Sequence, residues 1–165
     1  MTINEALLPE FDREMASTRK ILEAVPDDKM GWAPHGKSMS LGKLTGHIAQ
    51  LPDWAAGTMK TENLSLDDSY VPFMASSREE LMKAFDNYTS QCREALANAS
   101  DEEFMKVWKM DYKGKTVMEM PRIAVIRTMI LNHMIHHRGQ LSVYLRLLDI
   151  PVPGMYGPSA DEKPF

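Results

Sequence analysis

Residues 121–149 read PRIAVIRTMILNHMIHHRGQLSVYLRLLD, and the rest of the chain is expected to pack around this stretch. Apolar or imidazole side chains recur in steps of three or four, at Ile126, Ile130, His133, His137, Leu141, Tyr144 and Leu148. This spacing keeps side chains on one face of an α-helix. Pro121 suits a first helical turn, and Pro151 ends the pattern. The stretch therefore predicts one long helix, with two histidines where core residues are expected.

Length and composition limit the classes of protein that fit this chain. The 165 residues, of which 44% are apolar and 25% charged, predict one globular domain that spans residues 1–165. The net charge of −4 and the absence of a Lys/Arg run argue against nucleic-acid binding. The first residues lack the pattern of a secretory leader, and no apolar run approaches the ~18 residues of a membrane span. We therefore expect a cytoplasmic protein that does not enter a membrane.

The single cysteine restricts the chemistry of any metal site. Cys92 cannot form a disulfide within the chain, and one thiol cannot make a cysteine-rich zinc site. It lies on the apolar face of a predicted helix, where a buried and unreactive thiol is expected. Any metal ion is therefore expected to have nitrogen and oxygen ligands.

The same helical spacing predicts three further helices. The first covers residues 4–25, the second begins near Leu41 with Ser40 as its N-cap, and the third runs from Ser77 to about Ala99. Ser77 and Glu80 match a capping box, in which each side chain satisfies a backbone N–H at the start of a helix. A second such pattern begins at Ser100 and opens a short helix at most.

The segments between these helices differ in character. Residues 60–76 are polar and contain a proline, so we expect a long connection with at most a short turn of helix. Residues 110–117 alternate around Lys113 and Gly114, which is typical of a small β-hairpin before the last helix. Residues 151–159 are rich in proline and glycine and predict an extended tail. The fold class that follows is all-α, a four-helix bundle with at least one crossover connection.

Three histidines lie where their side chains are expected to meet. His133 and His137 are four residues apart, so on a helix they project side by side and can share one ion. His136 falls off the apolar stripe and is expected nearer the surface. His47 lies on the inward face of the second helix, with Trp54 two turns further on as a candidate for the mouth of a pocket. The spacing therefore predicts a metal site formed by His47, His133 and His137.

The alternative is that these histidines are core residues, each with a hydrogen-bond partner. Burying three imidazoles without an ion requires partners for all their ring nitrogens, and each unsatisfied group costs ~1–3 kcal/mol. Three neutral imidazoles would leave coordination positions of a divalent ion open, which is typical of catalytic sites. Such an ion can activate a water or a low-molecular-weight thiol. Zn²⁺, Ni²⁺ and Fe²⁺ all accept imidazole, and the sequence does not select among them.

Several runs of residues together resemble the DinB family. They are NHMIHHRGQLSVYLR at residues 132–146, PVP at 151–153, YGPSADE at 156–162, PHGKSMSL at 34–41 and GHI at 46–48. The resemblance covers most of the chain. It implies a four-helix bundle of up-down-down-up order, often a homodimer, with a metal held by three histidines. Carried over by position, these ligands are His47, His133 and His137, the last directly before Arg-Gly-Gln.

The resemblance implies an activity only in general terms. Similar proteins include thiol S-transferases and isomerases that use low-molecular-weight thiols. Our first hypothesis is a metal-dependent enzyme, of the thiol S-transferase or hydrolase type, that acts on a small molecule. The alternative is a non-catalytic bundle in which the metal ties two helices together. No catalytic residue beyond the metal ligands is assigned, and a homodimer is expected.

The sequence also predicts structural roles for four residues near the histidines. Gly139 lies inside the last helix, so we expect a close approach of another helix there. Arg138 is expected to be an ion-pair partner first and an anion-binding residue second. Metal-bound histidines usually donate their second ring N–H to a partner, and Asn132 and Gln50 are candidates for this role. A buried backbone carbonyl would serve as well.

Overall fold

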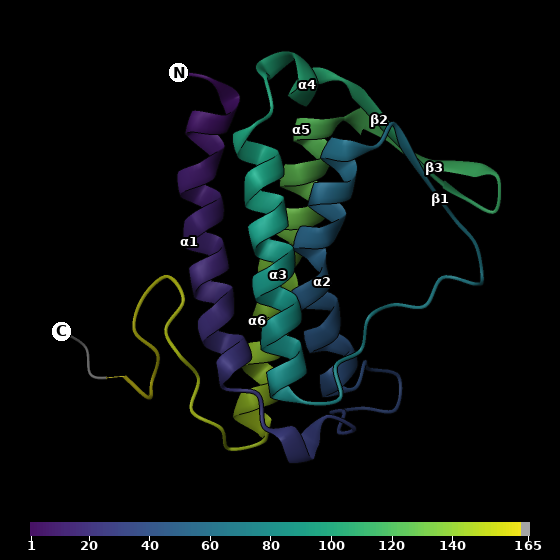
Figure 1. Ribbon diagram of the computed structural model, residues 1–165. Helices are drawn as coiled ribbons and strands as arrows, with labels where there is room; N and C mark the ends of the chain where they lie inside the picture. The colour runs from purple at the N-terminus through teal and green to yellow at the C-terminus, as the bar shows by residue number, and fades with distance from the viewer. Residues whose placement is uncertain (163–165) are drawn as a thin grey trace.

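The computed structural model describes residues 1–162, which form a mostly helical fold with a small three-stranded sheet (Figure 1). The chain passes down α1, up α2, up α3 after a long connection, and down α5, η2 and α6. No helix in this part of the chain combines the length and the hydropathy needed to cross a membrane. The elements are α1 (Ile3–Glu23), η1 (Asp27–Lys29), α2 (Leu41–Lys60), β1 (Asn63–Leu66), α3 (Arg78–Ala97), α4 (Asp101–Met105), β2 (Val107–Tyr112), β3 (Lys115–Pro121), α5 (Arg122–Val125), η2 (Ile126–Asn132) and α6 (His133–Leu147).

Side-chain caps explain where α2, α3 and α4 begin. The hydroxyls of Ser40, Ser77 and Ser100 each accept a hydrogen bond from the backbone N–H three residues later, which confirms the three predicted starts. The carboxylate of Glu80 accepts from the backbone N–H and hydroxyl of Ser76, so the capping box at Ser77 is only half formed. Helix α2 continues through Pro52 to Lys60 without a break.

The predicted helix over residues 121–149 is wrong in its first third. Pro121 ends β3, and α5 has only four residues before the chain enters the π-helix η2. A π-helix has i→i+5 hydrogen bonds and a wider turn, and it is often found near functional sites. Its seven residues still place Ile126 and Ile130 in the core, so the apolar spacing alone could not reveal it. His133 is the first residue of α6.

The sheet lies beside the helices and consists of one parallel and one antiparallel pair. Strand β2 pairs antiparallel with β3, and the turn between them contains Lys113 and Gly114, both with positive φ. Strand β1 pairs parallel with β2, so the expectation of at most a helical turn within residues 60–76 is wrong. The partner of β1 lies more than 40 residues away in the chain, and such non-local pairing is not visible in a short polar segment.

A buried ion pair ties the tail to α1 and α6. Arg138 is only 1% exposed and donates to the carboxylate of Glu14 at 2.6 Å. It also donates to the hydroxyl of Tyr156 at 2.6 Å, and this hydroxyl donates to Glu14 at 2.9 Å. Arg138 is therefore an ion-pair partner within the fold, as the sequence indicated.

Cys92 is also fully buried, and burial raises the pKa of its thiol to about 12, which keeps the thiol protonated.

Two glycines differ sharply in how closely they are packed. Gly139 is exposed, and a Cβ built on it would meet no atom within 4 Å, so the expected close approach of a helix is wrong. A Cβ on Gly46 would lie 2.6 Å from the carbonyl oxygen of Phe73. The segment before α3 therefore presses against α2 one residue before His47, where only glycine leaves room.

Removal of the Glu14 carboxylate should destabilise the protein strongly. The Glu14→Ala variant leaves the Arg138 charge buried without its counter-ion, and breaking such a pair typically costs ~3–5 kcal/mol. The matched control is Asp12→Ala, which removes the partner of Arg93 in an exposed pair on the same helix. That change should cost less than about 1 kcal/mol. Urea unfolding followed by circular dichroism measures both, and equal losses of stability would contradict the assigned role.

Candidate metal centre

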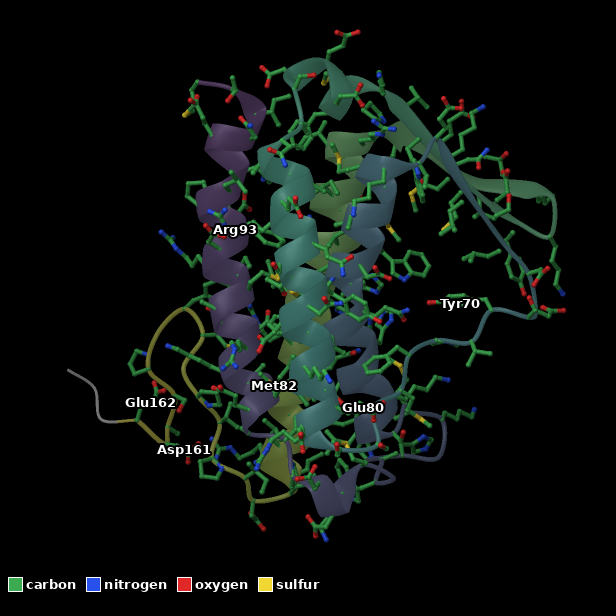
Figure 2. The ribbon with its side chains drawn as sticks, in the orientation of Figure 1. Tyr70, Glu80, Met82, Arg93, Asp161 and Glu162 are labelled. Atoms are coloured by element: carbon green, nitrogen blue, oxygen red, sulfur yellow. The ribbon has the colours of Figure 1, made fainter. Side chains whose placement is uncertain are left out.

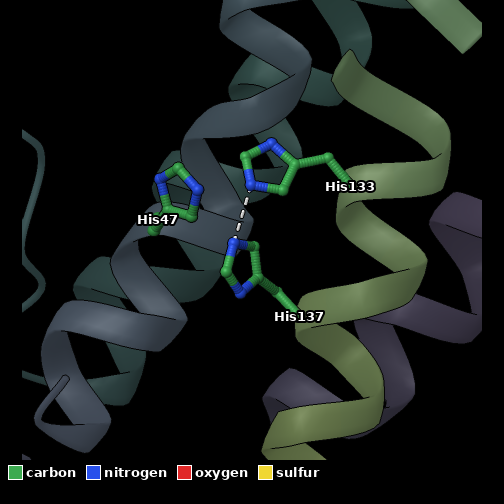
Figure 3. A group of neighbouring side chains, drawn as sticks. All are labelled: His47, His133 and His137. Carbon is green, nitrogen blue, oxygen red and sulfur yellow. Dashed lines mark hydrogen bonds between the residues drawn. The ribbon is translucent and has the colours of Figure 1, made fainter. Parts of the chain in front are cut away.

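The three histidines chosen from the sequence come together between α2 and α6 (Figure 3). His47 projects from α2 toward His133 and His137, which stand one turn apart on α6. One potential ligand atom of each residue lies within 4.8 Å of the others. His137 is buried and the other two are half-buried, whereas His136 is exposed as expected. That these side chains hold a metal ion stays a prediction, for which the geometry is suitable.

Hydrogen bonds fix the orientation of two of the rings. The Nδ1 atom of His133 lies 3.2 Å from the carbonyl oxygen of Met129, which can only accept, so we assign the proton to Nδ1. The Nδ1 atom of His137 lies 2.7 Å from Oε1 of Gln140, and we assign its proton in the same way. In their neutral forms both rings then present an unprotonated Nε2 to the centre of the group.

These two Nε2 atoms face each other at a distance of 2.8 Å. Two lone pairs so close repel each other unless a proton or a cation lies between them. Burial, followed by the neighbouring imidazoles, lowers the pKa of His47 to about 4. Burial is also the main cause of a lowered pKa of His137, which disfavours an additional proton on this ring.

A divalent cation fits this donor set. Neutral imidazoles are the ligand form that zinc, nickel and iron require, and metal binding must otherwise displace protons. Nitrogens bound to one tetrahedral zinc ion at ~2.0–2.1 Å lie roughly 3.3–3.4 Å apart, so the two Nε2 atoms need to separate by only about half an ångström to share an ion. The donor chemistry and the spacing therefore both agree with one ion bound by the three histidines.

Of the expected partners of the rings, only the backbone carbonyl is found: that of Met129 serves His133, whereas Gln140, which was not predicted, serves His137. Asn132 is exposed, and among residues 1–162 its side chain makes no hydrogen bond to a histidine ring. The Oε1 atom of Gln50 accepts from the hydroxyl of Tyr70 at 3.2 Å and from the backbone N–H of Phe73 at 3.1 Å. Gln50 therefore holds the connection before α3, and the expectation for both residues is wrong. The i, i+3 spacing of His137 and Gln140 on a helix is the signal that could have identified the partner.

A cavity of about 200 Å³ adjoins His47 and His133. Its wall is almost entirely apolar, and the part of the chain described here contributes no carboxylate, lysine or arginine to it. The one hydroxyl in the wall, that of Thr58, donates to the carbonyl of Trp54 at 2.9 Å. The lining residues are His47, Leu51, Trp54, Thr58, Trp108, Met110, Met118, Val125, Met129, Ile130 and His133.

Strands β2 and β3 cover this cavity, and the sequence analysis did not assign their side chains a role. Met110 and Met118 are direct cross-strand partners, so they share one face of the sheet with Trp108. Lys109 and Glu119 pair on the opposite face, with Nζ and Oε1 3.1 Å apart. The alternation of large apolar and charged residues in both strands was the available signal. Trp54 lines the cavity, as its position two turns after His47 suggested.

The role of Gln140 can be tested by its effect on metal affinity. The Gln140→Leu variant removes the acceptor of the His137 Nδ1–H, and loss of such a partner typically lowers metal affinity ~10–100-fold. The control is Asn132→Leu, since Asn132 is exposed and lies close to His133 in the chain. Zinc affinity, measured by competition with a chromogenic chelator, should fall only in the Gln140 variant. An equal effect of both changes would rule out the assigned contact.

Comparisons with known proteins agree with this fold. A model of the DinB family matches residues 1–163. The uncharacterised protein YrdA of Bacillus subtilis is 26% identical over 160 residues, which cover 94% of this chain and 89% of YrdA. A DinB-like protein of Bacillus cereus has a similar crystal structure, with a TM-score of 0.72, 24% identity and coverage of 94% of this chain and 98% of the other.

A second solved structure, the DinB-like protein YjoA of Bacillus subtilis, gives a TM-score of 0.70 at 19% identity. The match covers 91% of this chain and 97% of that protein. At these identities the two crystal structures establish the fold alone, whereas the family model extends over nearly every residue. The chain therefore belongs to the DinB family.

Proposed function

We propose that this protein is a metal-dependent enzyme in which His47, His133 and His137 hold one divalent ion beside the apolar cavity. The observation that carries the proposal is the distance of 2.8 Å between the Nε2 atoms of His133 and His137. With the tautomers assigned above no proton lies between them, and a cation there would remove the repulsion of the two lone pairs. Zinc, nickel and iron all suit three imidazoles. The substrate is a small molecule, because the adjoining cavity has a volume of about 200 Å³.

Residues around the three histidines orient their rings and exclude water from the adjoining cavity. The Met129 carbonyl and Gln140 keep the rings of His133 and His137 in the tautomer that presents Nε2. When bound, a divalent ion would supply an open coordination position and lower the pKa of a water or thiol, so that a nucleophile is available at neutral pH. Trp54, Trp108 and the methionines exclude water from the cavity and bind an apolar reactant beside that position.

The cavity favours a thiol over water as the nucleophile. Hydrolysis of an ester or amide usually requires a side chain that donates a proton to the leaving group, and the described cavity wall contains no such acid. In transfer from a low-molecular-weight thiol, the thiol loses its proton and its sulfur forms a bond to an electrophilic carbon. The bond from that carbon to the leaving group breaks, and a halide leaves as a stable anion without a proton donor. We therefore propose a thiol S-transferase, with a hydrolase as the alternative.

The resemblance to the family adds two features to the proposal, a bundle topology and an oligomeric state. The first is a four-helix bundle of up-down-down-up order, which is supported by the directions of α1, α2, α3 and α6 in Figure 1. The second is a homodimer, for which the family resemblance is the only support. Neither feature is needed for the chemistry of the three histidines, which all come from one chain.

Metal content is the first test of this proposal. Protein prepared without an affinity tag should contain about one divalent ion per chain, because three imidazoles form one site. The variants His47→Ala and His137→Ala should lose the ion and stay folded, whereas His136→Ala, which removes an exposed neighbour, should keep it. Elemental mass spectrometry measures the content, and an equal loss in the His136 variant would argue against a defined site.

The same variants test the reaction. Wild-type protein and His136→Ala should accelerate conjugation of cysteine or another small thiol to monochlorobimane, an apolar alkyl chloride whose product is fluorescent. The His47 and His137 variants should fall to the uncatalysed rate. Full metal content with no turnover of any thiol, combined with unfolding on chelation, would instead indicate a structural ion.

A further inference from the structure

A second cavity, of about 250 Å³, adjoins the one beside the metal centre. The two cavities share Trp54, Thr58 and Trp108 in their walls. Strand β1 contributes to the wall of the second cavity, and so does Tyr70 in the connection that follows β1. Figure 2 shows the Tyr70 side chain extending from this connection back toward α2. The second cavity is therefore enclosed by α2 and by the segment that crosses beside it.

Aromatic rings form one side of this cavity. The rings of Trp54 and Tyr70 meet almost at a right angle, 84°, with centroids 5.8 Å apart, so they form a corner. The Tyr70 hydroxyl donates to Gln50, which holds this ring in place. Trp108 is the third aromatic residue, and its Nε1–H donates to Thr61 at 3.1 Å. Aromatic faces attract organic cations through their quadrupoles, and several rings around one point are the usual arrangement for ammonium groups.

A carboxylate faces the same cavity. Asp53 precedes Trp54 on α2, is half-buried, and has no hydrogen-bond or ion-pair partner among residues 1–162. Burial raises the pKa of Asp53, and Lys60 on the same helix opposes this shift only in part. Gly57 lies one turn after Asp53, and a Cβ there would meet open space, so the cavity stays open beside the carboxylate. A cation in the cavity would offset the cost of holding this charge away from water.

We infer that this second cavity binds the ammonium group of a small organic molecule, with Asp53 supplying the opposite charge and Trp54, Tyr70 and Trp108 the aromatic faces. A single carboxylate between apolar walls does not suit calcium or magnesium, which require several oxygen ligands. A neutral ligand would leave the carboxylate without a partner. The inference goes beyond the proposed function and is independent of it, because none of these residues is a predicted metal ligand.

The position of the cavity suggests a use for the ammonium group, and this step, unlike the binding itself, rests on the proposed function. Because the two cavities share three residues, one molecule can reach both, with its reactive end beside the histidines and its cationic end beside Asp53. The second cavity would then select reactants that carry an amine or a quaternary ammonium group. Uncharged reactants of the same shape would bind less tightly, since they gain nothing from the carboxylate.

Choline and its uncharged isostere 3,3-dimethylbutan-1-ol test this inference, because they share a shape and differ in charge. Full-length protein with its metal content as purified is titrated with each compound, and tryptophan fluorescence and calorimetry are recorded. Choline should bind at least about tenfold more tightly than the alcohol, as expected for a partly desolvated charge pair. The Asp53→Asn variant should lose most of this preference, and what remains is the contribution of the aromatic faces. Glu79→Gln, which removes an exposed carboxylate on α3, should behave as the wild type.

A second pair of variants tests the corner formed by Trp54 and Tyr70. It also provides an independent test of the cavity in case the Asp53→Asn variant does not fold. Tyr70→Phe keeps the ring and should retain choline binding, whereas Tyr70→Leu should weaken it about fivefold. Absence of choline binding, equal affinity for both compounds, or an equal loss in Glu79→Gln would overturn the inference. Metal content is measured on the same preparation. Protein that lacks metal and still prefers choline would therefore contradict the proposed function and support the ammonium site.

Discussion

The site depends on the contact between the Nε2 atoms of His133 and His137, 2.8 Å apart. Each ring, while neutral, donates through Nδ1 to a nearby acceptor, so neither can present a proton to the other without losing that hydrogen bond. Burial lowers the pKa of His137, which disfavours a second proton on its ring. A cation shared by both lone pairs, with His47 as a third donor, satisfies every ring nitrogen that points inward.

The surrounding structure holds both sides of this contact in place. Arg138, directly after His137, is tied to α1 and to the tail through Glu14 and Tyr156. Gly46, directly before His47, lies against the backbone of the segment that precedes α3. The ligands therefore belong to helices fixed by buried neighbours on either side, and such fixed positions are what a pre-organised site requires. Two adjoining cavities lie beside these helices, one with an almost entirely apolar wall and one with a carboxylate in its wall.

The sequence revealed the parts of the site that follow helical spacing. His133 and His137 are four residues apart on α6, and His47 shares the apolar stripe of α2, so their meeting could be predicted from periodicity. The π-helix could not, because its residues Ile126–Asn132 keep an ordinary apolar pattern. The expected partners Gln50 and Asn132 were wrong, since a side chain near a ligand in sequence can point into another contact. Pairing of β1 with β2 and the second cavity depend on non-local contacts that no local pattern encodes.

The central claim is that one ion is bound by three imidazole nitrogens, and X-ray absorption at the zinc edge tests it most directly. Untagged protein loaded with one equivalent of Zn²⁺ should show three imidazole nitrogens at ~2.0–2.1 Å, identified by the outer scattering of the rings. One further light atom should complete the coordination, because the site is open. A spectrum with only oxygen neighbours and no imidazole scattering would contradict the account, and the histidines would then be core residues.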